Sequence, residues 1–184
     1  MSYIFSKRDQ LQHKFKVAFF DRDGTINYDY ADADWATITT PIIIPDAIKV
    51  LHLVLELGYK IIIITNQYLI GEKIISLEQY NLFSNHLIAE LSQHGIPILD
   101  VFFCPHSRDF NCNCRKPNTG LIDQAILKYP NISLSESIIV GDAQTDIKLA
   151  QRLNMKSFGI GLKGNIPNCT YVNCIGELLS VLDK

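Results

Sequence analysis

The amino-acid sequence predicts an α/β fold with a doubly wound, mostly parallel sheet in a single domain spanning residues 1–184. Two observations predict it. Short apolar runs end abruptly in polar residues, and stretches with helix-capping residues lie between these runs. The chain is long enough to bury about 70% of its unfolded surface in one core. Its composition, 47% hydrophobic and 20% charged, is near the average of globular proteins.

The expected strands are apolar runs that stop at a residue of different character. Lys16–Phe20 is such a run and ends at Asp21, as a buried strand does where it meets a polar site. Three further runs behave in the same way, over residues 60–64, 99–103 and 137–140. Residues 156–161 and 171–172 predict a fifth strand and a short sixth strand.

Helices are expected between these strands, over residues 46–57, 76–94 and 121–129, with a last one over 176–182. Ser76 and Gln79 have the spacing of a capping box, while Gly58 and Gly95 supply stop signals. Because strands alternate with helices, we expect a Rossmann-like sheet with helices on both faces. Residues 1–15 are polar enough to form a tail or a surface helix.

The charge and hydropathy patterns argue against nucleic-acid and membrane partners. Seventeen Lys and Arg against nineteen Asp and Glu give a net charge of −2, with no long block of like charges. The longest apolar runs, such as Ile61–Ile64, are far shorter than the ~20 residues of a membrane span, and residues 1–10 lack the apolar region of a signal peptide. We therefore expect a cytoplasmic protein with a small-molecule partner.

Carboxylates follow the predicted strands at their carboxyl ends, where open α/β sheets bind ligands. Asp21 and Asp23 come directly off the first strand, and two-residue alternation points them to the same side. Asp142 follows the fourth strand, and Asp146 lies one turn into the next helix. Clustered carboxylates repel one another unless a cation sits between them, and hard oxygen ligands suit Mg²⁺.

Four further residues, Thr65, Asn66, Arg115 and Lys116, supply the hydrogen-bonding groups and positive charge that a phosphate needs. An Asp-x-Asp-Gly tetrapeptide alone is more often an acidic turn. Here, however, each partner motif follows its own predicted strand. The carboxylates, the Mg²⁺ site and the basic clamp together predict phosphoryl transfer.

Four segments carry a family resemblance: Asp21–Thr25 (Asp-Arg-Asp-Gly-Thr), Thr65–Gln67 (Thr-Asn-Gln), Arg115–Pro117 (Arg-Lys-Pro) and Gly141–Asp146 (Gly-Asp-Ala-Gln-Thr-Asp). In kind and order they resemble the four motifs of the haloacid dehalogenase superfamily of phosphatases, over residues 17 to about 150. The cysteine segment before Arg115 is similar to that of the zinc-loop branch, which holds heptose bisphosphate phosphatase and the histidinol phosphatase domain.

The resemblance implies a small, capless phosphatase. Asp21 would be the nucleophile that forms an aspartyl phosphate, and Asp23 would be the general acid and base. Mg²⁺ would be held by Asp21, the backbone carbonyl of Asp23 and Asp142. Thr65, Arg115 and Lys116 would neutralise the phosphoryl oxygens, and Asp146 would steady Lys116 or the water shell of the metal.

A second metal is expected in the cysteine segment. Cys104-x-His106 with Cys112-x-Cys114 offers three thiolates and an imidazole, a full tetrahedral set for a structural Zn²⁺. The spacing departs from the two-residue gap of common zinc fingers, so the residues alone leave a zinc-free loop open. The resemblance favours zinc, which would fix the loop that carries the basic clamp.

The resemblance also favours a substrate, D-glycero-D-manno-heptose 1,7-bisphosphate losing its 7-phosphate, because residues 21–27 and the loop around Asp29 look like that branch. Histidinol phosphate is the alternative. One segment departs from the pattern. After Thr-Asn-Gln the family usually continues with Ser-Gly-Ile and an arginine-glycine pair, whereas residues 68–73 read Tyr-Leu-Ile-Gly-Glu-Lys. A different sugar phosphate therefore stays open.

Two functions other than catalysis share part of this pattern. A phosphoacceptor signalling domain would also use a doubly wound sheet, an acidic Mg²⁺ site and a Thr and Lys pair. Asp23 argues against it, because an acid and base two residues after the acceptor makes the phosphorylated state short-lived. A zinc-stabilised binding module would predict damaged catalytic motifs, and the expected residues are all present.

Overall fold

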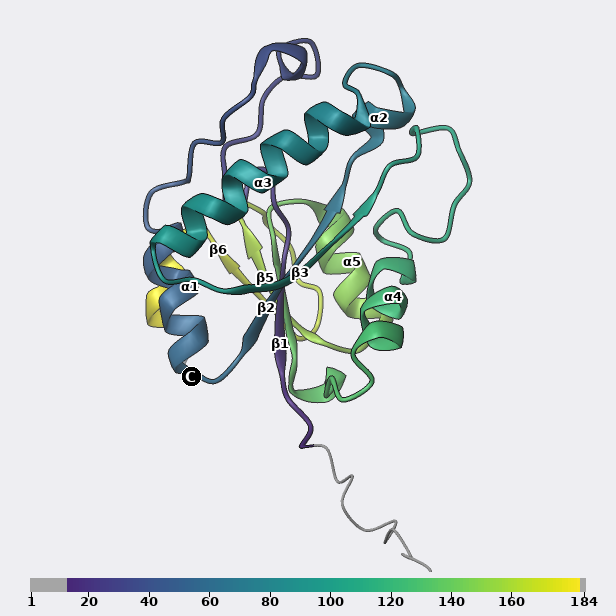
Figure 1. Cartoon of the computed structure of the whole chain (residues 1–184). Coiled ribbons are helices and arrows are strands. Elements are labelled where there is room, and N and C mark those ends of the chain that lie inside the picture. Colours follow the sequence, from purple (N-terminus) through teal and green to yellow (C-terminus); the bar gives the residue numbers. More distant parts are fainter. Residues whose placement is uncertain (1–12, 183–184) are drawn as a thin grey trace, which may run out of the picture.

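A six-stranded sheet with strand order β3-β2-β1-β4-β5-β6 forms the centre of the computed structural model, which describes residues 13–182 (Figure 1). Every pairing between neighbouring strands is parallel. The strands are β1 Val17–Phe20, β2 Lys60–Asn66, β3 Ile98–Cys104, β4 Ile138–Gly141, β5 Lys156–Ile160 and β6 Cys169–Val172. This order places a topological switch point between β1 and β4, where doubly wound folds open a crevice for ligands.

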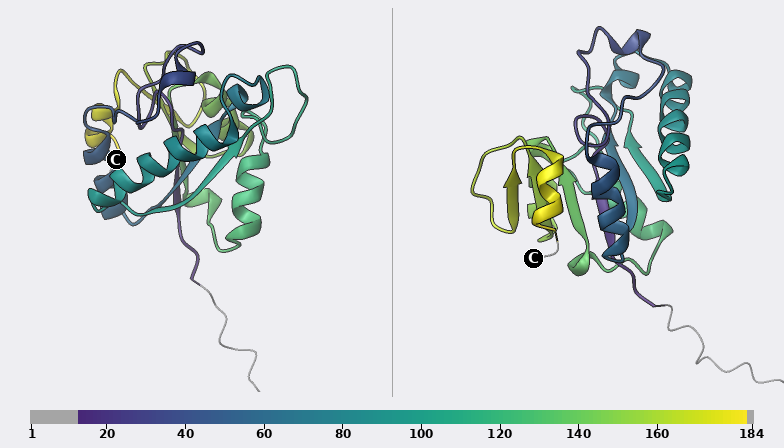
Figure 2. Two further views of the ribbon diagram at one scale, coloured as in Figure 1. Left: turned by 45° about the horizontal axis from the view of Figure 1, so that its top comes forward. Right: turned by 90° about the vertical axis from the view of Figure 1, so that its left-hand side faces the viewer.

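Helices cover both faces of the sheet, which Figure 1 shows nearly edge-on, and the right-hand view of Figure 2 looks onto the face that carries α1 (Ala47–Glu56). On that face also lie α3 (Leu77–Gln93) and a 3-10 helix, η3 (Ile175–Ser180); on the other lie α4 (Gly120–Lys128) and α5 (Gln144–Arg152). Successive side chains of β1 point to opposite faces of the sheet. Ala18 and Phe20 pack with the first group of helices, while Val17 and Phe19 pack with the second group. Burial of both faces explains why the central strands are almost continuously apolar.

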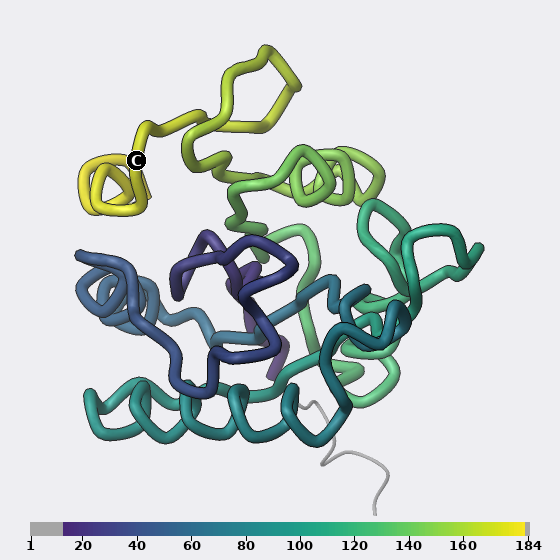
Figure 3. The backbone as a smooth tube through the Cα atoms, turned by 90° about the horizontal axis from the view of Figure 1, so that it is seen from above, coloured from purple at the N-terminus to yellow at the C-terminus, as the bar shows by residue number. Residues whose placement is uncertain are grey.

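The loops that follow the strands gather above the carboxyl edge of the sheet, which Figure 3 shows from above. They include residues 21–46, which hold a short 3-10 helix η1 (Trp35–Thr37), the short helix α2 (Tyr68–Gly71) and residues 105–119. A separate apolar cluster of Trp35, Leu69, Ile75, Tyr80 and Phe83 ties the first loop to α2 and α3. Within residues 13–182, no insertion forms a second layered unit over the sheet.

The expected elements agree with the observed ones in type and order, with differences at their ends. Strands β2 and β3 run on to Asn66 and Cys104, and α2 was not expected. The last predicted helix is a 3-10 helix that ends at Ser180. The capping box of Ser76 and Gln79 is confirmed.

Most of the expected tail at residues 1–15 lies outside the described residues. At its end, Phe15 bridges to Ile132, and its backbone exchanges hydrogen bonds with Asn131 and Ser133. None of the helices within residues 13–182 combines the length and apolar character that crossing a membrane requires.

Candidate active site

A cavity of about 280 Å³ opens at the carboxyl edge of the sheet, beside the switch point between β1 and β4. Its floor carries carboxylates and amides from the strand ends. Its wall carries aromatic and apolar groups from the loop over residues 21–46 and from α2. The lining residues are Asp21, Asp23, Asp29, Trp35, Thr65, Asn66, Gln67, Tyr68, Leu69, Asp142, Ala143 and Thr145.

Asp21 is fixed at the floor of the cavity. Its backbone N–H donates to the carbonyl of Val140 at 2.9 Å, which continues the β1–β4 ladder by one residue. Its Oδ1 accepts from the backbone N–H of Arg22 at 2.7 Å and lies 2.9 Å from Nζ of Lys116. Burial raises the pKa of Asp21 to about 7 against the opposing effect of Lys116. A nearby positive charge therefore lowers the free-energy cost of keeping this buried carboxylate ionised.

Lys116 is buried beneath the carboxylates. Its Nζ contacts Asp146 Oδ1 at 2.6 Å as well as Asp21, and it donates to the carbonyl of Ile64 at 2.8 Å. Burial lowers its pKa, but the two carboxylates outweigh burial and the net shift is upward. Lys116 therefore stays protonated as a fixed positive charge under the floor of the cavity.

The fit of a divalent cation is supported by a cluster of three carboxylates. One oxygen each from Asp21, Asp142 and Asp146 lies within 4.8 Å of the others. Burial, followed by the charge of Asp21, raises the pKa of Asp142 to about 6. Gly24, at φ +76°, packs so closely against Asp142 that no Cβ fits there. Crowded hard-oxygen donors with raised pKa values are a donor set that suits Mg²⁺.

Asp23 is held by three side chains. Nε and Nη2 of Arg22 donate to its two oxygens, each at 2.9 Å. Asn27 Nδ2 donates at 2.9 Å and Gln67 Nε2 donates at 2.7 Å. Four donors thus fix the direction of this carboxylate beside Asp21, as the two-residue alternation of the sequence predicted.

Arg22 itself is buried in an aromatic cage. Its guanidinium carbon lies 4.8 Å from the ring centre of Phe83, 5.2 Å from that of Tyr80 and 5.7 Å from that of Trp35. Nη1 donates to the hydroxyl of Ser84 at 2.9 Å. Cation–π contacts and hydrogen bonds together compensate the burial of this charge.

Thr65 and Asn66 lie at the end of β2, on the cavity floor. The hydroxyl of Thr65 accepts from Gln67 Nε2 at 2.9 Å. Asn66 exchanges two hydrogen bonds with the backbone of Lys116, at 2.9 and 3.2 Å, so that the loop carrying the lysine is locked to the strand end.

Arg115 is placed differently from the expectation that it lines the phosphate site. Its guanidinium donates to the carbonyl oxygens of Ser107 and Phe110, and it is absent from the cavity lining. The reason is local. The preceding residue, Cys114, belongs to the cysteine cluster, and the loop folds back so that its carbonyls take up the donors of Arg115.

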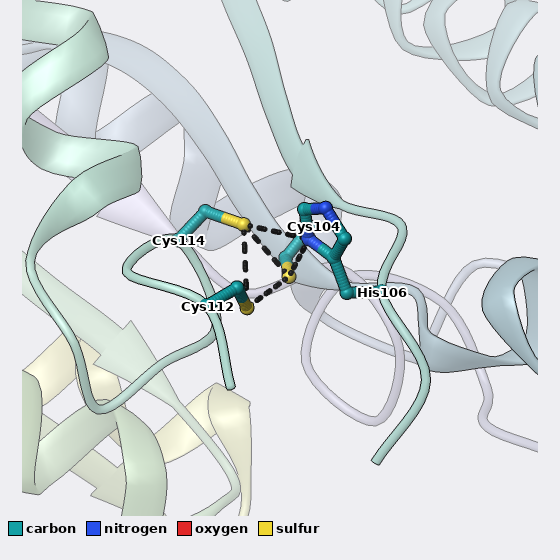
Figure 4. A group of neighbouring side chains, drawn as sticks. All are labelled: Cys104, His106, Cys112 and Cys114. Atoms are coloured by element: carbon teal, nitrogen blue, oxygen red, sulfur yellow. Dashed lines mark hydrogen bonds between the residues drawn. The ribbon is translucent and has the colours of Figure 1, made fainter. Parts of the chain in front are cut away.

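The predicted zinc ligands converge in one cluster, drawn in Figure 4. Cys104 ends β3, and His106, Cys112 and Cys114 follow in the loop. Sulfur–sulfur distances are 3.0, 3.5 and 3.6 Å, and His106 Nδ1 lies 3.2 Å from Cys114 and 3.5 Å from Cys104. A disulfide needs about 2.05 Å, whereas tetrahedral zinc with bonds of about 2.3 Å separates its sulfurs by roughly 3.8 Å. The cluster fits a metal cage.

The structure therefore brings together Asp21, Asp23, Thr65, Asn66, Lys116, Asp142 and Asp146 in one place and Cys104, His106, Cys112 and Cys114 in another. The roles of Arg22, Asn27 and Gln67 as partners of Asp23 were not predicted from the sequence. Arg22 and Gln67 stand inside two of the motifs and Asn27 follows the first, so the sequence marks their neighbourhood but not their contacts. Trp35 and Tyr68 line the cavity wall, and the sequence marks residues 68–73 only as a departure from the family pattern that bears on the substrate.

The chain is similar to several known proteins. The family model described as Polynucleotide kinase 3 phosphatase matches residues 16–159. D-glycero-alpha-D-manno-heptose-1,7-bisphosphate 7-phosphatase of Photorhabdus laumondii is 40% identical over 154 residues, which cover 77% of this chain and 80% of that protein. The histidine biosynthesis bifunctional protein of Buchnera aphidicola is 34% identical over 143 residues, 77% of this chain and 40% of that protein.

Among solved structures, D,D-heptose 1,7-bisphosphate phosphatase from B. bronchiseptica, complexed with magnesium and phosphate, matches with a TM-score of 0.78 at 21% identity. The match covers 91% of this chain and 97% of that one. The fold and the motifs at its strand ends are those of haloacid dehalogenase-type phosphatases. Within that class, the chain belongs to the family described as Polynucleotide kinase 3 phosphatase. It is accordingly a phosphatase, and the expected family is confirmed.

Proposed function

We propose that this phosphatase hydrolyses a phosphomonoester of a small sugar phosphate through an aspartyl-phosphate intermediate, and that D-glycero-D-manno-heptose 1,7-bisphosphate, losing its 7-phosphate, is its substrate. The observation that carries the chemistry is the pairing of Asp21 with buried Lys116 beside a clamped Asp23. The names of relatives in Photorhabdus laumondii and Thermoplasma volcanium, 40% and 37% identical, support the substrate.

In the first step, an oxygen of Asp21 attacks phosphorus in line, and the bond from phosphorus to the sugar oxygen breaks. Oδ1 of Asp21 is already occupied by Arg22 and Lys116, so we assign the attack to Oδ2. Asp23 donates a proton to the departing sugar oxygen. General acid catalysis of this kind contributes about 10²–10⁴ in rate.

In the second step, Asp23 takes a proton from water, and the water oxygen attacks the phosphorus of the aspartyl phosphate. The acyl phosphate bond breaks, which releases inorganic phosphate and restores the Asp21 carboxylate. Thr65 binds a phosphoryl oxygen through both steps, while Lys116, whose three N–H groups are taken by Asp21, Asp146 and the carbonyl of Ile64, neutralises phosphoryl charge from beneath the cavity floor. Arg115 supports this site by closing the cysteine loop.

Asp21, the backbone carbonyl of Asp23 and Asp142 would hold Mg²⁺, which supplies charge neutralisation for the crowded carboxylates and the phosphate. Cys104, His106, Cys112 and Cys114 would hold a structural Zn²⁺ with no open position. The thiols among the described residues are free, which fits the reducing cytoplasm.

The testing experiment is Mg²⁺-dependent phosphate release from a panel of phosphomonoesters. The panel holds both anomers of the heptose bisphosphate, histidinol phosphate, other sugar phosphates, an aryl phosphate and a 3′-phosphorylated oligonucleotide. A strong kcat/KM preference for one heptose anomer supports the proposal. Preference for histidinol phosphate or the oligonucleotide overturns the substrate but keeps the chemistry, and absence of turnover with both metals bound overturns the chemistry.

A further inference from the structure

Three segments that are distant in sequence meet at the mouth of the cavity. They are the loop containing Asp32, the helix α2 with Tyr68 and Glu72, and the cysteine loop with Arg108. Asp32, Glu72 and Arg108 lie outside the cavity lining described above, whereas Tyr68 belongs to it. Figure 3 shows the three segments side by side above the sheet.

Arg108 is the centre of this group. Its Nε and Nη2 donate to the two oxygens of Glu72 at 2.8 and 2.7 Å, and its backbone N–H donates to Glu72 at 3.2 Å. Nη2 also donates to Asp32 at 3.0 Å. The guanidinium carbon lies 4.3 Å from the ring centre of Tyr68, and the phenol of Tyr68 donates to Asp32 at 2.7 Å.

Isolated surface ion pairs contribute little, but this arrangement is a bidentate pair within a network and is stacked on a ring. Partial burial, followed by hydrogen bonding to Asp32, raises the pKa of Tyr68 to about 12, so its hydroxyl remains a donor. Gly71 packs against the backbone of residues 105–107 without room for a Cβ. Helix α2 therefore lies flush against the cysteine loop, just before Arg108.

Tyr68, its neighbour Leu69 and Trp35 line the same cavity as Asp21 and Thr65. A substrate whose phosphorus lies at Asp21 has to place its leaving group along this wall. We propose that Arg108 is a positioning residue for specificity: it couples the cysteine loop to the Tyr68 wall and thereby sets the affinity for the sugar part of the substrate. The inference rests on the proposed function, because it requires a sugar leaving group.

This coupling also gives residues 68–73, the segment that departs from the usual family pattern, a specific role. In this chain the segment supplies both the ring under the guanidinium and the carboxylate of Glu72 that grips it. The cysteine cluster fixes the loop that carries Arg108, since its member His106 lies two residues before Arg108.

The test compares Arg108→Ala, Arg108→Lys and Tyr68→Phe with the wild type. Lys128→Ala is the matched control, because Lys128 also forms an exposed ion pair but lies on α4 away from the cavity. We expect KM for the preferred sugar phosphate to rise about tenfold in Arg108→Ala while kcat changes less than about twofold. Arg108→Lys should resemble Ala, because an ammonium reproduces neither the fork nor the stacking.

Inhibition by inorganic phosphate and the zinc content separate a specificity role from a merely structural one. The inference requires that both stay at wild-type values in Arg108→Ala. An unchanged KM overturns it, and so does a phosphate inhibition constant that rises in proportion to KM. Failure of the proposed function is distinguishable, since it would appear as absence of sugar phosphate turnover by the wild type.

Discussion

At the scale of single residues, the nucleophile makes the sharpest prediction. Asp21→Asn should abolish turnover, because an amide oxygen cannot form the acyl phosphate intermediate. Folding should be nearly unchanged, since burial already raises the pKa of Asp21 to about 7 and Lys116 keeps its pair with Asp146. Phosphate release and thermal unfolding of the purified variant are the measurements. Substantial residual hydrolysis would exclude Asp21 as the nucleophile.

Arg22 is the residue through which the direction of Asp23 can be tested. In Arg22→Lys the two hydrogen bonds to Asp23 cannot both form, whereas those from Asn27 and Gln67 remain. We expect kcat/KM for a sugar phosphate to fall about 10–100-fold, part of the range of general acid catalysis. An aryl phosphate, whose leaving group needs little protonation, should lose much less.

Ser84→Ala is the control for that experiment, because it removes a contact of Arg22 and leaves those to Asp23 intact. Ser84→Ala should change kcat/KM little for either the sugar phosphate or the aryl phosphate. An equal loss for sugar and aryl phosphates in Arg22→Lys would mean that Arg22 only stabilises the fold. Thermal unfolding should be recorded for both variants, since weakening a buried ion pair has its own cost.

Which site residues are predictable from sequence depends on what fixes them. Asp21, Asp23 and Asp142 follow from strand ends, because backbone alternation and topology alone deliver them to one edge. Arg115 could not be placed in this way, since its direction is set by loop carbonyls that only the folded chain reveals. The role of Arg22 likewise depends on aromatic rings contributed by α3 and the loop after β1.

At the scale of elements, the cysteine loop is predicted to depend on its metal. Cys112→Ser removes one of four ligands, so zinc should be lost together with part of the stability of the folded protein. Elemental analysis and thermal unfolding measure the two effects. Cys169→Ser, which lies outside the cluster, is the control and should change neither. A variant of Cys112 that retains full zinc and full stability would contradict the four-ligand cage.

The strands and main helices were predictable because their signals are local. Apolar runs flanked by polar residues mark buried parallel strands, and Ser76 with Gln79 marks a helix start. Helix α2 was missed because four residues carry too little periodicity, and it is instead held by packing of Leu69 in the aromatic cluster and of Gly71 on the cysteine loop. Segment 175–180 winds as a 3-10 helix, a choice between closely similar conformations that hydrophobic pattern does not decide.

At the scale of the whole molecule, the crowded carboxylates of the active site destabilise the folded state when they are ionised. One oxygen from each of three carboxylates lies within 4.8 Å of the others. Burial raises the pKa of Asp21 to about 7 and that of Asp142 to about 6. In the unfolded chain both ionise near 3.8. Without metal the folded state therefore binds protons more tightly than the unfolded state, and stability falls as pH rises from about 4 to about 7.

Mg²⁺ should reverse that loss, because it takes the place of the protons between the carboxylates. We expect Mg²⁺ to raise Tm only slightly at pH 5, where protons already neutralise the carboxylates. At pH 8 we expect Tm to rise by about 2–4 °C for each kcal/mol of unfolding free energy that Mg²⁺ restores. Asp142→Asn should flatten both the pH dependence of the metal-free protein and the gain from Mg²⁺. A gain that is independent of pH in the wild type would mean that the cation binds away from these carboxylates. The fold would then tolerate their crowding through Lys116 alone.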